Sequence, residues 1–206
     1  MKKALILFVV SFLLIGSSFA QVKISGGVLA GLNLANLTVD PTPTGVDFNN
    51  LTGFAAGGVL NFEFAGGFGI QVEPMYIQNG SKVSENGSEI KIKANYLDIP
   101  VILMYTFATG QGEVEPYIMA GPVLGVRLSA KETNGGEVDI KDYTKGTNFA
   151  GTFGAGVKIP AGMNRIFIEG RYTIGFTDVQ NGFATGYTIK TKGIQVLAGI
   201  TFPFGS

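Results

Sequence analysis

The chain has 206 residues, of which 46% are hydrophobic and only 15% are charged, and its formal net charge is +0. Histidine and cysteine are both absent, which excludes Ser-His and Cys-His nucleophilic sites, the usual zinc spheres and any disulfide. Because the formal net charge is +0, the charge also gives no support to nucleic-acid binding. The composition therefore points away from an enzyme and from a metal, cofactor or nucleic-acid site.

The first twenty residues, MKKALILFVVSFLLIGSSFA, have the layout of a secretory signal peptide. Lys2 and Lys3 precede an apolar stretch from Ala4 to Ile15, and small residues follow at Ser18 and Ala20. The apolar part is short for a membrane anchor. We predict a signal peptide over residues 1–20, cleaved after Ala20, and a single domain over residues 21–206.

Apolar residues mostly alternate with small or polar ones beyond residue 20. In the segment 164–177, for example, Ile166, Ile168 and Ile174 share one parity, while Arg165, Glu169 and Arg171 share the other. A period of two indicates β-strands with one apolar face. Eight strands are predicted, at about 22–36, 53–65, 67–79, 90–107, 113–129, 148–160, 164–177 and 187–204.

Short and long connections alternate strictly between these strands. The short ones fall at 65–67, 108–112 and 160–164, and the long polar ones at 37–51, 80–89, 130–147 and 178–186. Short turns on one rim and long loops on the other are typical of transmembrane β-barrels. The predicted fold class is all-β, an eight-stranded antiparallel up-and-down transmembrane β-barrel with its apolar face toward lipid.

Aromatic residues cluster near the predicted short-turn ends, where an interfacial girdle is expected. They are Phe64, Phe68, Phe107, Phe167, Phe202 and Phe204, and Phe167 alone has the inward parity.

Several segments resemble the PorT-like outer-membrane β-barrel family. QVEPMYIQNG (71–80), NYLDIPVILMYTF (95–107) and EPYIMAGPVLGVRLSAK (115–131) resemble its central motifs. GVLAGLNLANL (27–37) resembles its opening strand, and GAGVKI (154–159) with IEGRYTIGFTDV (168–179) its closing half. The resemblance implies a small barrel in the outer membrane of a Gram-negative bacterium. It also implies relatives of which some are linked to protein secretion and most have no assigned activity.

Charged residues on the inward parity are the candidate site residues. An eight-stranded barrel is only wide enough to be filled by side chains, so opposite charges inside it are expected to pair. We predict a structural network in the lumen, with no catalytic, cofactor or metal site, from Glu63, Glu73, Asp98, Glu115, Arg127, Lys158, Glu169 and Arg171.

The stretch NYLDIPVILMY (95–105) predicts a local irregularity. Its odd-numbered apolar residues face lipid in the barrel, whereas Ile90 and Ile92 lie on the even parity. A change of face beside Pro100 is what a β-bulge produces. We predict an irregular ladder between Ala94 and Pro100, with Asp98 inside the barrel and directed toward a basic group.

Three functional hypotheses follow. The first is a structural or interaction protein of the outer membrane that acts through its long loops, with lipid, lipopolysaccharide and another envelope or secretion protein as partners. The second is a narrow channel for small solutes. The third is a soluble lipocalin-like barrel that binds a ligand, with its apolar parity inside.

Overall fold

The computed structural model describes residues 22–85, 88–110, 112–182 and 186–204. The predicted signal peptide lies outside these residues and stays a prediction. The strands are β1 (Lys23–Asp40), β2 (Val46–Glu63), β3 (Phe68–Val72), β4 (Met75–Glu85), β5 (Ser88–Thr106), β6 (Glu115–Thr133), β7 (Glu137–Asp139), β8 (Thr147–Ala161), β9 (Asn164–Gly175) and β10 (Thr188–Phe204).

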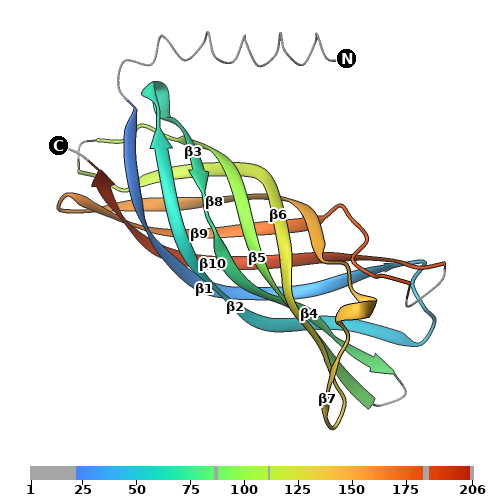
Figure 1. Cartoon of the computed structure of the whole chain (residues 1–206). Helices are drawn as coiled ribbons and strands as arrows, with labels where there is room; N and C mark the ends of the chain where they lie inside the picture. Colours follow the sequence, from blue (N-terminus) through green and yellow to red (C-terminus); the bar gives the residue numbers. More distant parts are fainter. Residues whose placement is uncertain (1–21, 86–87, 111, 183–185, 205–206) are drawn as a thin grey trace.

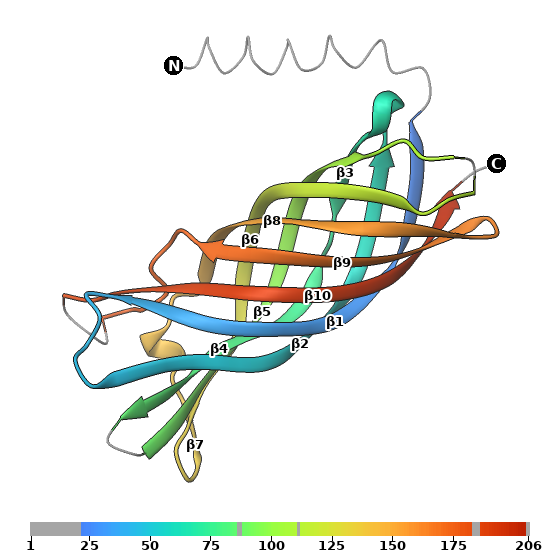
Figure 2. The same ribbon diagram turned by 180° about the vertical axis from the view of Figure 1, so that it is seen from behind.

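The strands close into a barrel, drawn from opposite sides in Figures 1 and 2. Each wall strand pairs antiparallel with its sequence neighbour, and β1 also pairs with β10 over Ile24–Asp40, which closes the ring. β3 and β4 form one wall strand, because both pair with β2 on one side and with β5 on the other. Only β7 lies outside the ring, paired with the outer end of β6. The predicted eight-stranded barrel is confirmed.

The strands are longer than predicted at the long-loop end. β1 runs to Asp40 and β2 begins at Val46, so the first predicted loop shrinks to residues 41–45. β4 and β5 likewise continue as a hairpin through the second predicted loop. The third contains β7 and a 3-10 turn, η3 (Lys141–Tyr143). These extensions carry no continuous apolar face, because beyond the hydrocarbon core both faces of a strand can meet water; alternation alone therefore could not reveal them.

The outward surface is apolar, as predicted. Leu103 is 58% exposed, Val28 59% and Phe153 53%, values that suit side chains in contact with lipid. Phe68, Phe107, Phe202 and Phe204 are also exposed near the short-turn end, whereas Phe167 is buried inside, as its parity predicted. Within the described residues, no helix is long and apolar enough to cross a membrane.

The predicted ladder irregularity is present between β5 and β6. Asn95 pairs with Ser129 and the next residue, Tyr96, pairs with Arg127, so the register shifts by one residue. The extra residue is Leu128 of β6, however, and the pairing of β5 with β4 stays regular. The reason given from the sequence was therefore wrong: β5 does not change face, and Ile92 lines the inside of the barrel.

Candidate functional site

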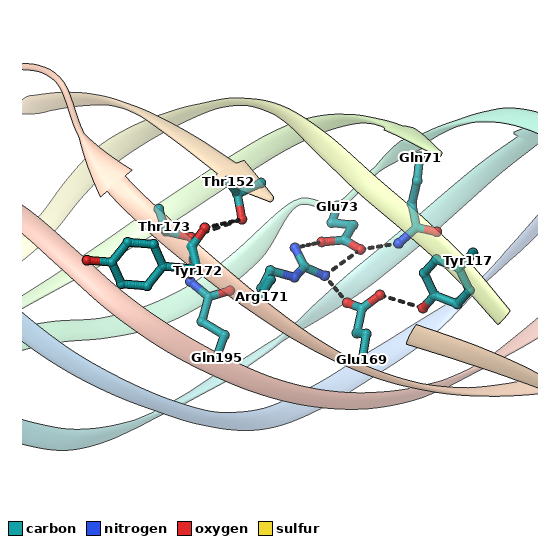
Figure 3. A network of polar contacts seen from close by, with 9 residues as sticks. All are labelled: Gln71, Glu73, Tyr117, Thr152, Glu169, Arg171, Tyr172, Thr173 and Gln195. Atoms are coloured by element: carbon teal, nitrogen blue, oxygen red, sulfur yellow. Dashed lines mark hydrogen bonds and ion pairs between the residues drawn. The ribbon is translucent and has the colours of Figure 1, made fainter. Parts of the chain in front are cut away.

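The centre of the barrel holds a buried ionic network, shown in Figure 3. Arg171 of β9 lies between two carboxylates, Glu73 and Glu169, and all three side chains are at most 1% exposed. Arg171 Nη1 donates to Glu73 Oε2 at 2.6 Å and Nη2 donates to Glu73 Oε1 at 3.0 Å, while Nη2 also pairs with Glu169. Tyr117 donates its hydroxyl to Glu169 Oε2 at 2.7 Å, and Gln71 donates to Glu73. We call these five residues the central network.

Strand register and glycines position the central network. Arg171 lies opposite Gly154 of β8, and Glu169 lies opposite Gly156. A side chain at Gly154 would collide with Arg171, and one at Gly156 would collide with the ring of Tyr117. The two glycines therefore leave room for the large side chains that cross the lumen. The buried fork between Arg171 and Glu73 is the geometry in which charge-assisted hydrogen bonds are strongest.

A second ionic group lies at the short-turn mouth. Lys158 Nζ is 2.6 Å from Glu63 Oε1, and Arg165 Nη1 is 3.0 Å from Glu63 Oε2 and 3.4 Å from Glu115 Oε2. These residues line a cavity of about 490 Å³ at this mouth. Arg165 was not among the predicted site residues, although its parity placed it inward; it lies close to the predicted turn at 160–164.

Asp98 lies inside, as predicted, but does not meet a basic group. Its side chain is buried, and among the described residues it forms no ion pair and its Oδ1 has no hydrogen-bond partner. It borders a small polar cavity, of about 10 Å³, shared with Asn33, Asn148 and Gln195. The predicted pairing of Asp98 is therefore wrong, because the nearest inward positions are filled by amides and hydroxyls.

Arg127 also departs from the predicted lumen network. Its guanidinium donates to the backbone carbonyls of Lys141 and Thr144, and it pairs with no carboxylate among the described residues. Both carbonyls belong to the loop between β7 and β8. Arg127 consequently fastens an outer loop to the barrel, a role that parity alone could not distinguish from a place in the lumen.

The central network fills the middle of the lumen with paired charges. In the described residues no group of three or more acidic side chains is placed to hold a metal ion. Each charge of the central network is matched by an opposite charge or a hydrogen bond, which lowers the cost of burying it. Fold and lumen together define a transmembrane barrel whose centre is occupied by this network.

Comparison with known proteins agrees with this class. Residues 19–181 match the family model described as outer membrane protein beta-barrel domain, so the chain belongs to this family and lies in the bacterial outer membrane. The match covers the barrel domain in general and does not single out PorT-like proteins. A comparison with curated proteins found no significant sequence match.

Three solved outer-membrane protein structures are similar to this chain. Neisserial surface protein A is similar with a TM-score of 0.51 and 18% identity, over 87% of this chain and 97% of that one. Ail of Yersinia pestis, solved with the heparin analogue sucrose octasulfate, has a TM-score of 0.48 and 16% identity over 87% and 99%. The N-terminal barrel of Pseudomonas aeruginosa OprF has 0.42 and 12% over 89% and 100%. At these identities the likeness to Neisserial surface protein A shows the fold alone.

Proposed function

We propose that the protein is a sealed, non-enzymatic barrel that acts through its outer end, as a structural and interaction protein. The central network carries this proposal, because Arg171, Glu73 and Glu169 fill the section of the lumen that a solute would have to pass. A barrel of eight strands leaves no further room for a water-filled path. The absence of histidine and cysteine supports a role without catalysis.

The lipocalin-like alternative does not fit this fold. It required the apolar parity inside and the polar parity outside. Many large apolar side chains are instead exposed on the wall, and the buried charges lie inside. The narrow channel keeps the same fold but needs an open lumen, so conductance separates it from the sealed barrel.

Lipopolysaccharide is the partner that the outer end supports best. Lys82 pairs directly with Lys91 across β4 and β5, and Lys93 pairs with Lys131 across β5 and β6. These four lysines share the outward parity with the lipid-facing residues of β5. Like charges placed opposite each other repel, and anionic phosphates at the membrane surface would relieve that repulsion. Lys131 is already partly neutralised by Glu137 at 2.7 Å.

A second envelope protein, including a component of a secretion apparatus, is part of the same proposal. The PorT-like segments support it, together with the length of the outer extensions. β7 projects beyond the ring and offers exposed side chains such as Val138, which is 61% exposed. Crosslinking from Val138 in cells, with Phe153 on the lipid face as control, would identify such a partner.

The lipopolysaccharide contact can be tested by thermal unfolding. The four-lysine variant K82Q/K91Q/K93Q/K131Q and a control, Lys23→Gln at the opposite end, would be reconstituted in vesicles with and without lipopolysaccharide. Lipopolysaccharide should raise Tm of the natural protein and of the control because a bound ligand stabilises the folded state. The gain should fall by at least half in the four-lysine variant. An equal gain in all three proteins would contradict the contact.

A further inference from the structure

An apolar cavity lies inside the outer end of the barrel, separate from the ionic networks. Its volume is about 110 Å³, and polar atoms make up only a small part of its wall. Tyr96 also borders it, from the same strand as Asp98. The main apolar lining comes from Leu37, Ile92, Ala94, Ile140, Val179 and Ile189.

The cavity has a roof built from two loops. Ile140 comes from the loop between β7 and β8, and Val179 comes from the loop between β9 and β10. Backbone hydrogen bonds join the two loops: Lys145 N donates to Val179 O at 2.7 Å, and Asn181 N donates to Tyr143 O at 2.8 Å. Val179 N also donates to Ile189 O at 2.8 Å, which ties the roof to β10.

Side chains fasten the roof at further points. Arg127 holds the first loop through the carbonyls of Lys141 and Thr144. Asp178 Oδ1 accepts from Ile189 N at 2.9 Å and from Gln180 N at 3.3 Å. Burial acts to raise the pKa of Asp178, but these backbone amides and the nearby ammonium of Lys145 outweigh it and hold the pKa below its usual value. The roof is therefore a preorganised structure over an apolar space.

We propose that this cavity is a binding site for a hydrocarbon group, either one aromatic ring or the end of an alkyl chain. An apolar cavity of about 150 Å³ in another protein stays dry and binds benzene, so the size here suits a group of that class. Hydrocarbon filling the space gains dispersion contacts that a void lacks. The group belongs to a free small molecule or to the end of a lipid acyl chain, and both sources present the same chemistry to the wall.

Two of the residues that line this site could be recognised in the sequence. Ile92 and Ala94 share the inward parity of β5 with Asp98 and Pro100, which lie on the same strand nearer the short-turn end of the barrel. Apolar side chains on the inward face of a membrane barrel are unnecessary for contact with lipid. Their presence here is accounted for by the cavity, and no change of face is needed to explain them.

The test uses the full-length mature barrel in lipid nanodiscs, with isotope-labelled isoleucine methyl groups and benzene as the probe. The methyl signals of Ile92 and Ile189 should shift with saturation at increasing benzene. Those of Ile168 and Ile194, which face lipid, should drift without saturation. A magnetisation transfer from lipid chain protons to Ile92 before benzene is added would identify an acyl chain as the occupant; saturation without that transfer would identify a free small molecule.

Two variants and one control decide the outcome. Ala94→Phe fills the cavity and should abolish the saturable shift, whereas Ala198→Phe makes the same change on the lipid face and should keep it. Ile140→Asp places a charge in the roof, outside the barrel wall, and should weaken binding at least tenfold even if Ala94→Phe fails to fold. Linear shifts at Ile92 in the natural protein, or saturation that persists in Ile140→Asp, would overturn the proposal.

Discussion

Replacement of Arg171 by methionine tests whether the central network stabilises the barrel. The guanidinium is 1% exposed and is the cation that both Glu73 and Glu169 contact. Methionine keeps much of the length and removes the charge and all donors. Two carboxylates would then face each other in the lumen, with Gln71 and Tyr117 as the remaining hydrogen-bond donors among the described residues.

The size of the effect follows from the contacts. At an effective dielectric constant of about 20, two unit charges about 4 Å apart interact by about 4 kcal/mol. Removal of one partner from a buried pair typically costs about 3–5 kcal/mol, because the remaining charge keeps its desolvation penalty. Arg171→Met is therefore expected to lower the free energy of unfolding by about 3–5 kcal/mol.

The assay is urea-dependent unfolding in lipid vesicles, followed by the heat-modifiable gel mobility of the folded barrel. Arg165→Gln is the matched control: it also removes an arginine that contacts two carboxylates, but its side chain is 34% exposed. Its effect should stay within about 1 kcal/mol. Equal losses in the two variants, or no loss in Arg171→Met, would refute the reasoning. A double variant with Glu73→Gln should recover part of the loss.

Three further predictions concern other parts of the barrel. Asp98→Asn should raise the free energy of unfolding by about 1 kcal/mol, because it removes a buried carboxylate without an ion-pair partner among the described residues; a loss measured by the same urea assay would contradict this. Gly27→Ala should reduce the folded fraction on gels, since its Cβ would collide with the carbonyl oxygen of Ile200 across the closing seam; normal folding would contradict it. Because the pKa of Asp178 is lowered in the folded state, its contribution is complete above the ordinary value of about 3.9 and is lost as the pH falls through the lowered value. The protection factor of the Val179 amide against hydrogen exchange should fall over that range, and in Asp178→Asn it should be low at every pH; an unchanged protection factor in the variant would contradict the prediction.

The barrel itself could be predicted because its physical cause repeats along the chain. Alternation such as that of Ile166, Ile168 and Ile174 records which face meets lipid, and this holds for every wall strand. The strand ends could not be predicted equally well. Beyond the membrane the pattern loses its apolar face, so the continuation of β1 to Asp40 and the β4–β5 hairpin have no equivalent signal.

The candidate site could likewise be predicted only in part. Parity placed Glu73, Glu169 and Arg171 inside, and the structure brings them together. Parity could not say which charges meet, because that depends on the tilt and register of strands far apart in sequence. Asp98 therefore lies among amides, and Arg127 reaches a loop instead of a carboxylate.

Leu128 shows a further limit of sequence reasoning. The irregular ladder could be located near Asn95 because the apolar pattern changes there, but two strands share that ladder. The apolar residues at the outer end of β5 had two explanations, a change of face or an apolar interior. The regular pairing of β5 with β4 and the position of Ile92 in the wall of the apolar cavity distinguish them.

Single-channel recording in planar bilayers tests the central claim most directly. If Arg171 and its two carboxylates seal the lumen as proposed, the natural protein shows no steady conductance steps. Steady single-channel steps from the folded protein, altered in size when Arg171 is neutralised, would contradict the sealed barrel and establish the narrow channel in its place.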